Sequence, residues 1–261
     1  MGSENGALLE IRDLMVHFVL RDGMLRKGRA VVQAVSGVSL ALTRGEVFGL
    51  VGESGCGKTT LGKAVVGLAP VLSGEIRLAG DSVIGLTGAA AKARARRIQL
   101  IFQDPYASLH PRKTVRDLVG VGLKIHGLAH GYQIDEQVLA ILEEVGLGLD
   151  HLYRYAHEFS GGQRQRIGIA RALAVGPDFI VADEPVSALD VSVQAQVLQL
   201  LADIRDRLEL TMLFITHDLR VAAQVCDEIA VMRHGEIVES GPTADVFVDP
   251  QHAYTRELLA A

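Results

Sequence analysis

The strongest chemical signal in the chain is a glycine-rich segment with the sequence Gly52-Glu53-Ser54-Gly55-Cys56-Gly57-Lys58-Thr59-Thr60. It follows an apolar run at 47–51 that predicts a buried strand, and it precedes residues 61–68, which predict a helix. Glycines in such a turn let backbone N–H groups converge on a phosphate at a helix N-terminus. Lys58 would reach the β- and γ-phosphates, and the Thr59 hydroxyl would bind Mg²⁺. The spacing predicts a nucleoside triphosphate site, rather than a turn that merely joins strand to helix.

Two adjacent carboxylates, Asp183 and Glu184, follow a second apolar run at 179–182. In a plain core, neighbouring carboxylates would repel each other, whereas they suit a site that holds Mg²⁺ and a water molecule. Asp183 would support the magnesium shell, and Glu184 would orient or deprotonate the attacking water. The alternative is an ordinary strand end at the surface.

Two further polar residues stand directly after predicted strands. Gln103 follows the strand expected at 98–102, and His217 follows the one at 211–216. Ligands of α/β proteins bind at the carboxyl ends of strands, so Gln103 is a candidate contact to Mg²⁺ or water. His217 is a candidate contact to the γ-phosphate, although a hydrogen-bonded structural histidine is an equally simple interpretation.

A second glycine-containing segment, Ser160-Gly161-Gly162-Gln163, precedes a predicted helix that runs to residue 174. Serine is a good N-cap, and the N–H groups at a helix start favour an anion. A turn at 187–190 leads from the carboxylate pair into a long helix at 191–208. The chain therefore has two candidate phosphate-binding helix starts.

The remaining pattern predicts an α/β fold with separate β and helical parts. Residues 8–50 alternate apolar and polar positions and predict an antiparallel sheet, interrupted by a basic stretch at 21–29 that we expect to be a solvated hairpin tip. Phe18, just before that stretch, is either a core residue or a platform for a base. Between 104 and 159 the apolar residues change to helical spacing, which predicts an inserted helical lobe.

Composition excludes several classes of protein. The 261 residues suffice for one large domain, and no apolar run approaches the roughly 20 residues of a membrane helix. We expect no secretory signal, and the two cysteines, Cys56 and Cys226, suit a reducing compartment. The net charge of −5 argues against a nucleic-acid partner.

In this order, the glycine-rich loop, strand-end glutamine, helical lobe, Ser-Gly-Gly-Gln, Asp-Glu and strand-end histidine resemble the ATP-binding-cassette (ABC) ATPases over essentially the whole chain. The resemblance implies a P-loop nucleotide-binding domain with a mixed central sheet, an antiparallel β lobe and an inserted helical lobe. Within a single domain at 1–261, we expect a RecA-like core with the β lobe at 8–103 and 160–240. The helical lobe is then at 104–159 and a C-terminal tail at 241–261.

The resemblance also implies a head-to-tail dimer of two cassettes that hydrolyse ATP with Mg²⁺. Ser160, Gly161, Gly162 and Gln163 of one subunit would grip the γ-phosphate held by the other. Asp190 would belong to the dimer contact, and Phe18 would stack on adenine. One departure from the family pattern is Phe159, which stands where leucine is commoner.

Shorter motifs are similar to those of the importers for dipeptides, oligopeptides and nickel: Glu53–Lys58, Phe102–Pro105, Ser108–Arg112, Ile215–Leu219 and His252–Leu259. This implies a peripheral subunit at the cytoplasmic face of the membrane. Its partners would be a second cassette, identical or different, two permeases and, indirectly, an external solute-binding protein.

The expected solute is a peptide or a related small molecule. Because the chain ends at Ala261 without the cysteine-bearing extension of many peptide importers, nickel or a metal chelate stays open. A further alternative is an accessory cassette of a soluble enzyme complex of the phosphonate-lyase type.

Overall fold

The computed structural model describes residues 6–21 and 29–260, which fall into two compact units. Unit 1 consists of 1–86 and 213–261, and unit 2 consists of 87–212. The expected hairpin tip lies largely at 22–28, outside the described residues. Each unit contains strands and some of the candidate site residues.

Unit 1 contains both ends of the chain. Its elements are β1 (Ala7–Arg21), β2 (Arg29–Thr43), β3 (Val47–Val51), α1 (Lys58–Val65), β4 (Ser73–Leu78), β5 (Asp81–Ser82), α8 (Leu219–Val225), β9 (Glu228–Arg233), β10 (Glu236–Pro242), α9 (Thr243–Val248) and α10 (Ala253–Ala260). β8 (Thr211–Thr216) begins in unit 2 and ends in unit 1.

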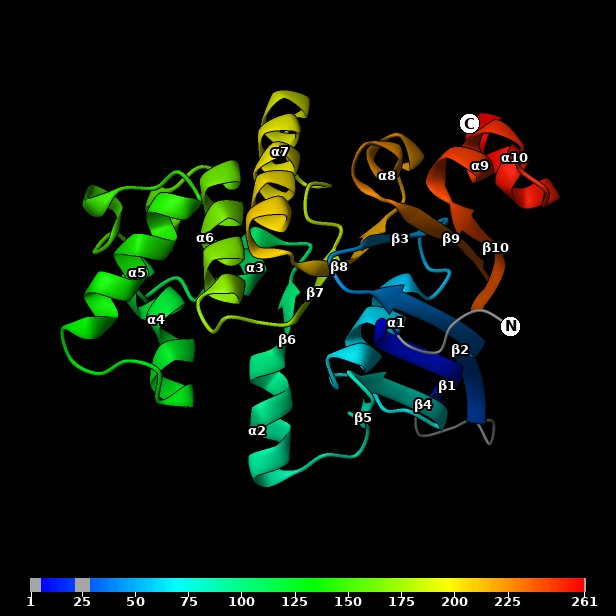
Figure 1. The fold of residues 1–261 in the computed structure, drawn as a ribbon, viewed down its shortest axis with the longest axis horizontal. Coiled ribbons are helices and arrows are strands. Elements are labelled where there is room, and N and C mark those ends of the chain that lie inside the picture. Colours follow the sequence, from blue (N-terminus) through cyan, green and yellow to red (C-terminus); the bar gives the residue numbers. More distant parts are fainter. Residues whose placement is uncertain (1–5, 22–28, 261) are drawn as a thin grey trace. The chain divides into compact units, whose positions relative to one another are not determined.

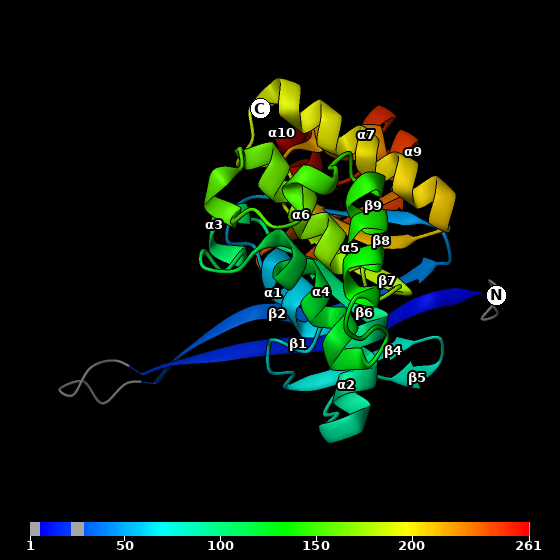
Figure 2. The same ribbon diagram turned by 90° about the vertical axis from the view of Figure 1, so that its left-hand side faces the viewer.

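An antiparallel sheet in the order β2-β1-β4-β5 forms one layer of unit 1. β1 and β2 run side by side as the long ribbon seen in Figure 2, with Leu9 opposite Leu42 and Phe18 opposite Val32. Leu9, Ile11, Leu14 and Val16 of β1 are buried, whereas Glu10, Arg12, Asp13 and Met15 are half-buried or exposed. The antiparallel pairing of β1 with β2 and β4 confirms the antiparallel sheet predicted from residues 8–50.

The second sheet of unit 1 has the order β10-β9-β3, with β8 on the other side of β3. β3 is parallel to β9, and β9 is antiparallel to β10. All five residues of β3 are buried, as expected for a strand covered on both faces. The sheet is therefore mixed, and the carboxyl end of β3 leads directly into the glycine-rich segment.

Unit 2 is mainly helical. Its elements are α2 (Gly88–Arg97), β6 (Ile98–Ile101), α3 (Pro105–Ser108), α4 (Val115–His126), α5 (Gln133–Glu144), the 3₁₀ turns η1 (Leu149–His151) and η2 (Ala156–Glu158), α6 (Gly161–Leu173), β7 (Phe179–Asp183) and α7 (Val191–Leu208). β6 and β7 are parallel neighbours, with Ile98 opposite Phe179 and Ile101 opposite Ala182. Their carboxyl ends therefore lie at the same edge.

Helix α6 is at the centre of the helical packing in unit 2. It lies beside α5 and α7 in Figure 1, and it also contacts α3 and α4. Its buried side includes Ile167, Ile169 and Ala170, whereas Gly161 at its start is half-buried. The N-terminus of α6 carries the Ser-Gly-Gly-Gln sequence, so the packing of α6 fixes the position of that sequence within the unit.

Strand positions were predicted better than helix ends. The strands expected at 47–51, 179–182 and 211–216 and the helix at 191–208 are confirmed. The helix expected at 61–68 was wrong in its bounds: α1 spans Lys58–Val65, because Lys58, Thr59 and Thr60 form its first turn. Helices α3, α4 and α5 lie within 104–159. Among the described residues, no helix combines the length and apolar character needed to cross a membrane.

Candidate functional site

The glycine-rich loop between β3 and α1, residues 52–60, is called the phosphate loop below. Gly52 and Gly57 have φ angles of 150° and 115°. A Cβ atom at Gly52 would lie 2.2 Å from the carbonyl oxygen of Met232, and one at Gly57 would lie 2.1 Å from that of Ala34. Both contacts are with backbone atoms, which cannot rotate away, so the loop needs glycine at these positions.

Lys58 is the first residue of α1, and its side chain is almost fully buried, with 4% of the residue exposed. Its Nζ donates to the carbonyl oxygens of Gly52 at 2.7 Å and Glu53 at 2.8 Å, so the ammonium group is held against the loop itself. A buried cation with two neutral acceptors suits a ligand that brings negative charge. This geometry fits the phosphates of a nucleotide.

The start of α1 favours an anion for a second reason. Its N-cap is Gly57, whose missing side chain makes no capping hydrogen bond, and the first turn of the described helix has no acidic residue. Backbone N–H groups at an uncapped helix start carry partial positive charge. Thr59 and Thr60, both half-buried, place hydroxyl groups in the same turn.

Two other predicted residues lie in unit 1. Phe18 is on β1 and is 37% exposed, so it is a surface side chain rather than a core one. His217 follows β8 and is also exposed, and the next residue, Asp218, caps α8 by accepting from the backbone N–H of Arg220 at 2.8 Å. His217 also lines a cavity of about 590 Å³ with Phe247 and Leu258.

In unit 2, Gln103 and Glu184 are in contact. Gln103 lies just after β6, Asp183 is the last residue of β7, and Glu184 follows it. Because β6 and β7 are parallel neighbours, the residues at their carboxyl ends lie close together. Gln103 Nε2 donates to Glu184 Oε2 at 2.9 Å, which leaves the amide oxygen of Gln103 as a possible ligand for a cation. Glu184 is 9% exposed, and its φ is 46°, in the left-handed region.

The candidate magnesium ligands Thr59, Gln103 and Asp183 are all oxygen donors, as Mg²⁺ prefers. Within 6–21 and 29–260, no three His, Cys, Asp or Glu side chains are grouped so that they could hold a metal ion. The oxygen chemistry of Thr59, Gln103 and Asp183 fits Mg²⁺, which proteins usually bind through one or two carboxylates together with substrate phosphates.

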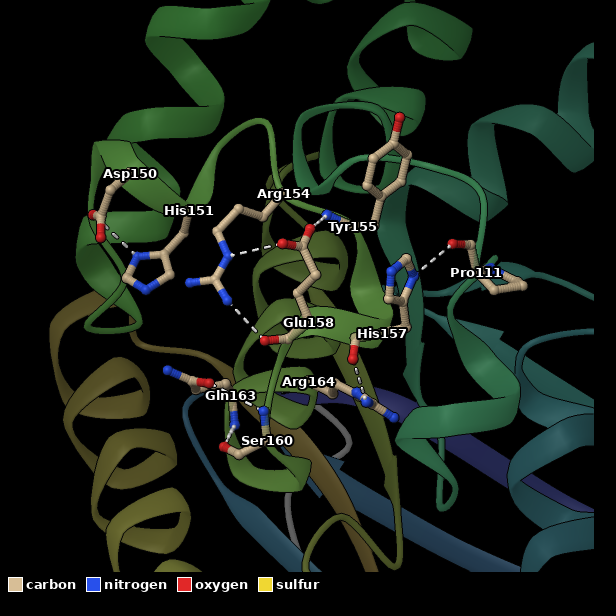
Figure 3. Close-up of polar contacts among 10 residues, drawn as sticks. All are labelled: Pro111, Asp150, His151, Arg154, Tyr155, His157, Glu158, Ser160, Gln163 and Arg164. Atoms are coloured by element: carbon tan, nitrogen blue, oxygen red, sulfur yellow. Dashed lines mark hydrogen bonds and ion pairs between the residues drawn. The ribbon is translucent and has the colours of Figure 1, made fainter.

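Ser160–Gln163, called the signature loop below, forms a complete capping box at the start of α6 (Figure 3). Ser160 Oγ accepts from the backbone N–H of Gln163 at 3.4 Å, and Gln163 Oε1 accepts from that of Ser160 at 3.1 Å. The predicted cap is confirmed, and the Gln163 side chain is folded back onto Ser160. A Cβ atom at Gly162 would lie 2.3 Å from Cγ1 of Val193 in α7.

The segment before the signature loop explains how phenylalanine replaces leucine at 159. Phe159 is buried, with 3% exposed, and the Arg154 guanidinium lies 4.7 Å from its ring centroid. The centroid of the His151 ring is 5.5 Å from that of the Phe159 ring. Arg154 Nη2 donates to the Glu158 carbonyl oxygen at 2.8 Å, a contact drawn in Figure 3. The face of an aromatic ring attracts a cation such as the Arg154 guanidinium, whereas a leucine side chain makes no such interaction.

Asp190 is the N-cap residue of α7, but its side chain makes no capping hydrogen bond and is exposed. Sequence reasoning missed two arginine contacts between α6 and the residues after β6. Arg164 lies 3.8 Å above the centroid of the Tyr106 ring, and Arg171 Nη1 donates to the Ser108 carbonyl at 2.6 Å. The repeated arginines in the sequence of α6 indicated that such contacts could exist, but the sequence did not identify the residues that they contact.

Comparison with known proteins decides the family. The sequence model described as ABC transporter matches residues 35–187. The chain belongs to the ABC transporter family. A Brucella ovis protein provisionally named as a peptide import ATP-binding protein is 50% identical over 97% of this chain and 78% of its own length. The oligopeptide transport ATP-binding protein OppF of Bacillus subtilis is 49% identical over 97% of this chain and 82% of its own length.

Solved structures agree with this assignment. A dimeric post-hydrolysis state of the ATP-binding cassette MJ0796, bound to ADP and Pi, has a TM-score of 0.78 and 26% identity. The match covers 90% of this chain and 98% of that one. The predicted family, the α/β cassette fold and the ATPase activity are confirmed. This cassette binds ATP, and the assignment of individual residues to that site stays a prediction.

Proposed function

We propose that this cassette is the ATP-hydrolysing subunit of an importer for peptides or a related small solute. The observation that carries the proposal is 49–50% identity, along 97% of the chain, to cassettes named for peptide import. The fold and the geometry of both loops support the same chemistry. Nickel or metal-chelate import, and an accessory role in a soluble enzyme complex, are the competing outcomes of the experiment below.

In this proposal, the phosphate loop and Lys58 bind the ATP phosphates. Thr59, Gln103 and Asp183 hold Mg²⁺, which when bound draws charge from the phosphate oxygens. Glu184 takes the proton of the attacking water, and Gln103 keeps the Glu184 carboxylate in place through its amide hydrogen bond. His217 contacts the γ-phosphate, and Phe18 stacks on adenine.

The signature loop is proposed to act on ATP bound by a second cassette, identical or different, with Asp190 at the dimer contact. The capping box holds the start of α6 in place through the N–H groups of Ser160 and Gln163, and the first turn has no acidic side chain that would repel a phosphate, which supports this role. Closure of the two cassettes on ATP would then transmit force to two permeases at the cytoplasmic face of the membrane. The external solute-binding protein would contact this chain only through those permeases.

A groove in unit 2 supports permease docking. Its volume is about 310 Å³, and its lining includes Ser108 and His110 of the importer-like motif Ser108–Arg112. It presents more positive than negative side chains beside an apolar floor: Lys113, Lys124, Arg171, Asp117, Leu118 and Val121. These residues suit a short permease segment with an acidic side chain and an apolar side chain.

Co-purification tests the assembly. The tagged chain would be extracted from native membranes in detergent, and its partners identified by mass spectrometry. We expect two polytopic permeases and a second cassette, and the associated binding protein can then be screened with di- and oligopeptides and with Ni²⁺. Recovery with soluble enzymes and without permeases would overturn the importer proposal, while leaving the ATPase chemistry in place.

Glu184→Gln tests the catalytic assignment. Removal of the base should slow ATP turnover by a factor on the order of 10² or more while ATP binding is retained. Phosphate release by the purified complex and equilibrium ATP binding are the two measurements. Glu136→Gln, at an exposed position on α5, is the matched control and should leave both unchanged. Near-normal turnover in the Glu184→Gln complex would exclude Glu184 as the base.

A further inference from the structure

The peptide group between Gly52 and Glu53 in the phosphate loop is held at both ends. Its carbonyl oxygen, on Gly52, accepts from Lys58 Nζ at 2.7 Å. Its N–H, on Glu53, donates to the phenolic oxygen of Tyr254 at 3.2 Å. Hydrogen bonds at opposite ends of one peptide group polarise it and strengthen each other. Tyr254 is therefore linked to Lys58 through a single peptide unit.

Tyr254 lies in α10, about two hundred residues along the chain from the loop that it contacts. It is 2% exposed, and the Arg233 guanidinium lies 4.6 Å from its ring centroid. Arg233 ends β9 and follows Met232, whose carbonyl oxygen lies against Gly52. The end of β9 and helix α10 thus form one wall behind the phosphate loop within unit 1.

Helix α10 is itself fastened to the sheet of unit 1. Glu239 of β10 accepts from the backbone N–H groups of Gln251 at 2.7 Å and His252 at 3.0 Å. His252 Nδ1 accepts from the backbone N–H of Tyr254 at 3.1 Å. These bonds fix the start of α10 and the direction in which Tyr254 points. Figure 1 shows α10 next to β9 and β10.

We propose that Tyr254 is a positioning residue for ATP binding: its hydroxyl holds the Gly52–Glu53 peptide, and this peptide holds the Lys58 ammonium group. The inference rests on the proposed role of Lys58 and extends it to the C-terminal tail. Because α10 contacts the phosphate loop, the affinity for ATP depends on how firmly α10 is held against unit 1. Burial raises the pKa of Tyr254, so the phenol keeps its proton at neutral pH.

Tyr254→Phe tests the proposal because it removes one hydroxyl and keeps the ring against Arg233. Loss of one neutral hydrogen bond should weaken ATP binding roughly three- to tenfold. The KM for ATP should rise in the same proportion, and kcat should stay nearly unchanged. Tyr132→Phe, at a position that is 74% exposed, is the matched control and should leave both constants at their wild-type values.

Three further variants and measurements separate the possible outcomes. Glu239→Ala, which loosens the start of α10 without touching the phosphate loop, should also weaken ATP binding, by less than Tyr254→Phe. Lys58→Ala should abolish binding; if it binds ATP normally, the proposed function of the loop fails and the inference fails with it. If Lys58→Ala loses binding but folded Tyr254→Phe binds ATP like the wild type, the inference alone is overturned. A fall in the Tm of Tyr254→Phe with unchanged ATP affinity would overturn it as well, because the hydroxyl would then stabilise the fold without positioning Lys58.

Discussion

The phosphate loop and the signature loop are both glycine-containing turns at helix starts, yet different kinds of atoms hold them. Around Gly52 and Gly57 the nearest atoms are backbone carbonyl oxygens of neighbouring strands. Around Gly162 the nearest atom belongs to the Val193 side chain, and the loop is fixed by the Ser160 and Gln163 side chains.

This difference predicts how each loop tolerates substitution. The backbone carbonyl groups that face Gly52 and Gly57 cannot move unless a whole strand shifts, so few substitutions are tolerated in the phosphate loop. The side chain that faces Gly162 can itself be replaced, so a second substitution can restore the packing there. Phe159 is one example, because the Arg154 guanidinium packs on its ring where leucine is commoner in the family.

Gly57→Ala should show the largest effect on folding. The added methyl would lie 2.1 Å from the Ala34 carbonyl oxygen, at a φ of 115°. Overpacking and left-handed strain together should lower the free energy of unfolding by about 2–5 kcal/mol. Denaturant unfolding followed by circular dichroism measures this change.

Gly55→Ala is the matched control in the same loop. Gly55 also has a positive φ, of 83°, but a Cβ atom there meets nothing within 4 Å. Only the strain should remain, at about 1–2 kcal/mol. If both alanine substitutions lower the free energy of unfolding equally, the positive φ, rather than the contact with the Ala34 carbonyl group, is what makes the loop require glycine.

Gly162→Ala in the signature loop should have a smaller and repairable effect. Its Cβ would lie 2.3 Å from Val193 Cγ1, and overpacking of this kind costs about 1–3 kcal/mol. The double variant Gly162→Ala/Val193→Ala removes the clash and should recover part of that loss. If the double variant is no more stable than the sum of the two single changes predicts, the contact with the Val193 side chain is not the cause.

The smallest effect concerns the ion pair of Arg116 with Asp135, which joins α4 to α5. The hydrogen bond from Arg116 lowers the pKa of Asp135, and Tyr153 donates to the same carboxylate at 3.1 Å. A lowered pKa in the folded state stabilises the protein above the ordinary Asp pKa, about 4, and this stabilisation is lost as the pH falls through the lowered value.

Asp135→Asn should therefore have a slightly lower Tm than the wild type at pH 7, and the difference should shrink as the solution is acidified below about pH 4. Thermal unfolding of both proteins across this range gives the answer. A Tm difference that is constant with pH would mean that the pair does not contribute through its charge. Gly57→Ala, in contrast, should keep its Tm deficit at every pH, because the clash does not titrate.

Local patterns predicted the features that depend on local physics. The buried strands, such as 47–51, were recognised because short continuous apolar runs bounded by glycine or carboxylates are typical of strands covered on both faces. The cap at Ser160 was predicted because a serine side chain at a helix start accepts from an N–H group two or three residues ahead. The start of α1 was placed too late, because the Lys58–Thr60 sequence was assigned to the loop.

Contacts between distant segments could not be predicted in this way. The bond from Glu53 to Tyr254 and the packing of Arg164 on Tyr106 join residues that share no periodicity in the sequence. Their partners are decided by the order of the strands and by helix packing. The contact of Gln103 with Glu184 was accessible in part, because both residues were recognised at strand ends, whereas the neighbouring order of β6 and β7 came from the structure.

The backbone of Glu184 has one more consequence, for the evolution of the protein. A glutamate at a φ of 46° costs roughly 1–2 kcal/mol relative to a residue that accepts the left-handed region without strain. Selection for folding alone would therefore favour glycine at position 184, whereas the catalytic role proposed for Glu184 would require the carboxylate. On the proposed role, a cassette that no longer had to hydrolyse ATP would gain stability if glycine replaced Glu184, because glycine adopts this φ without strain.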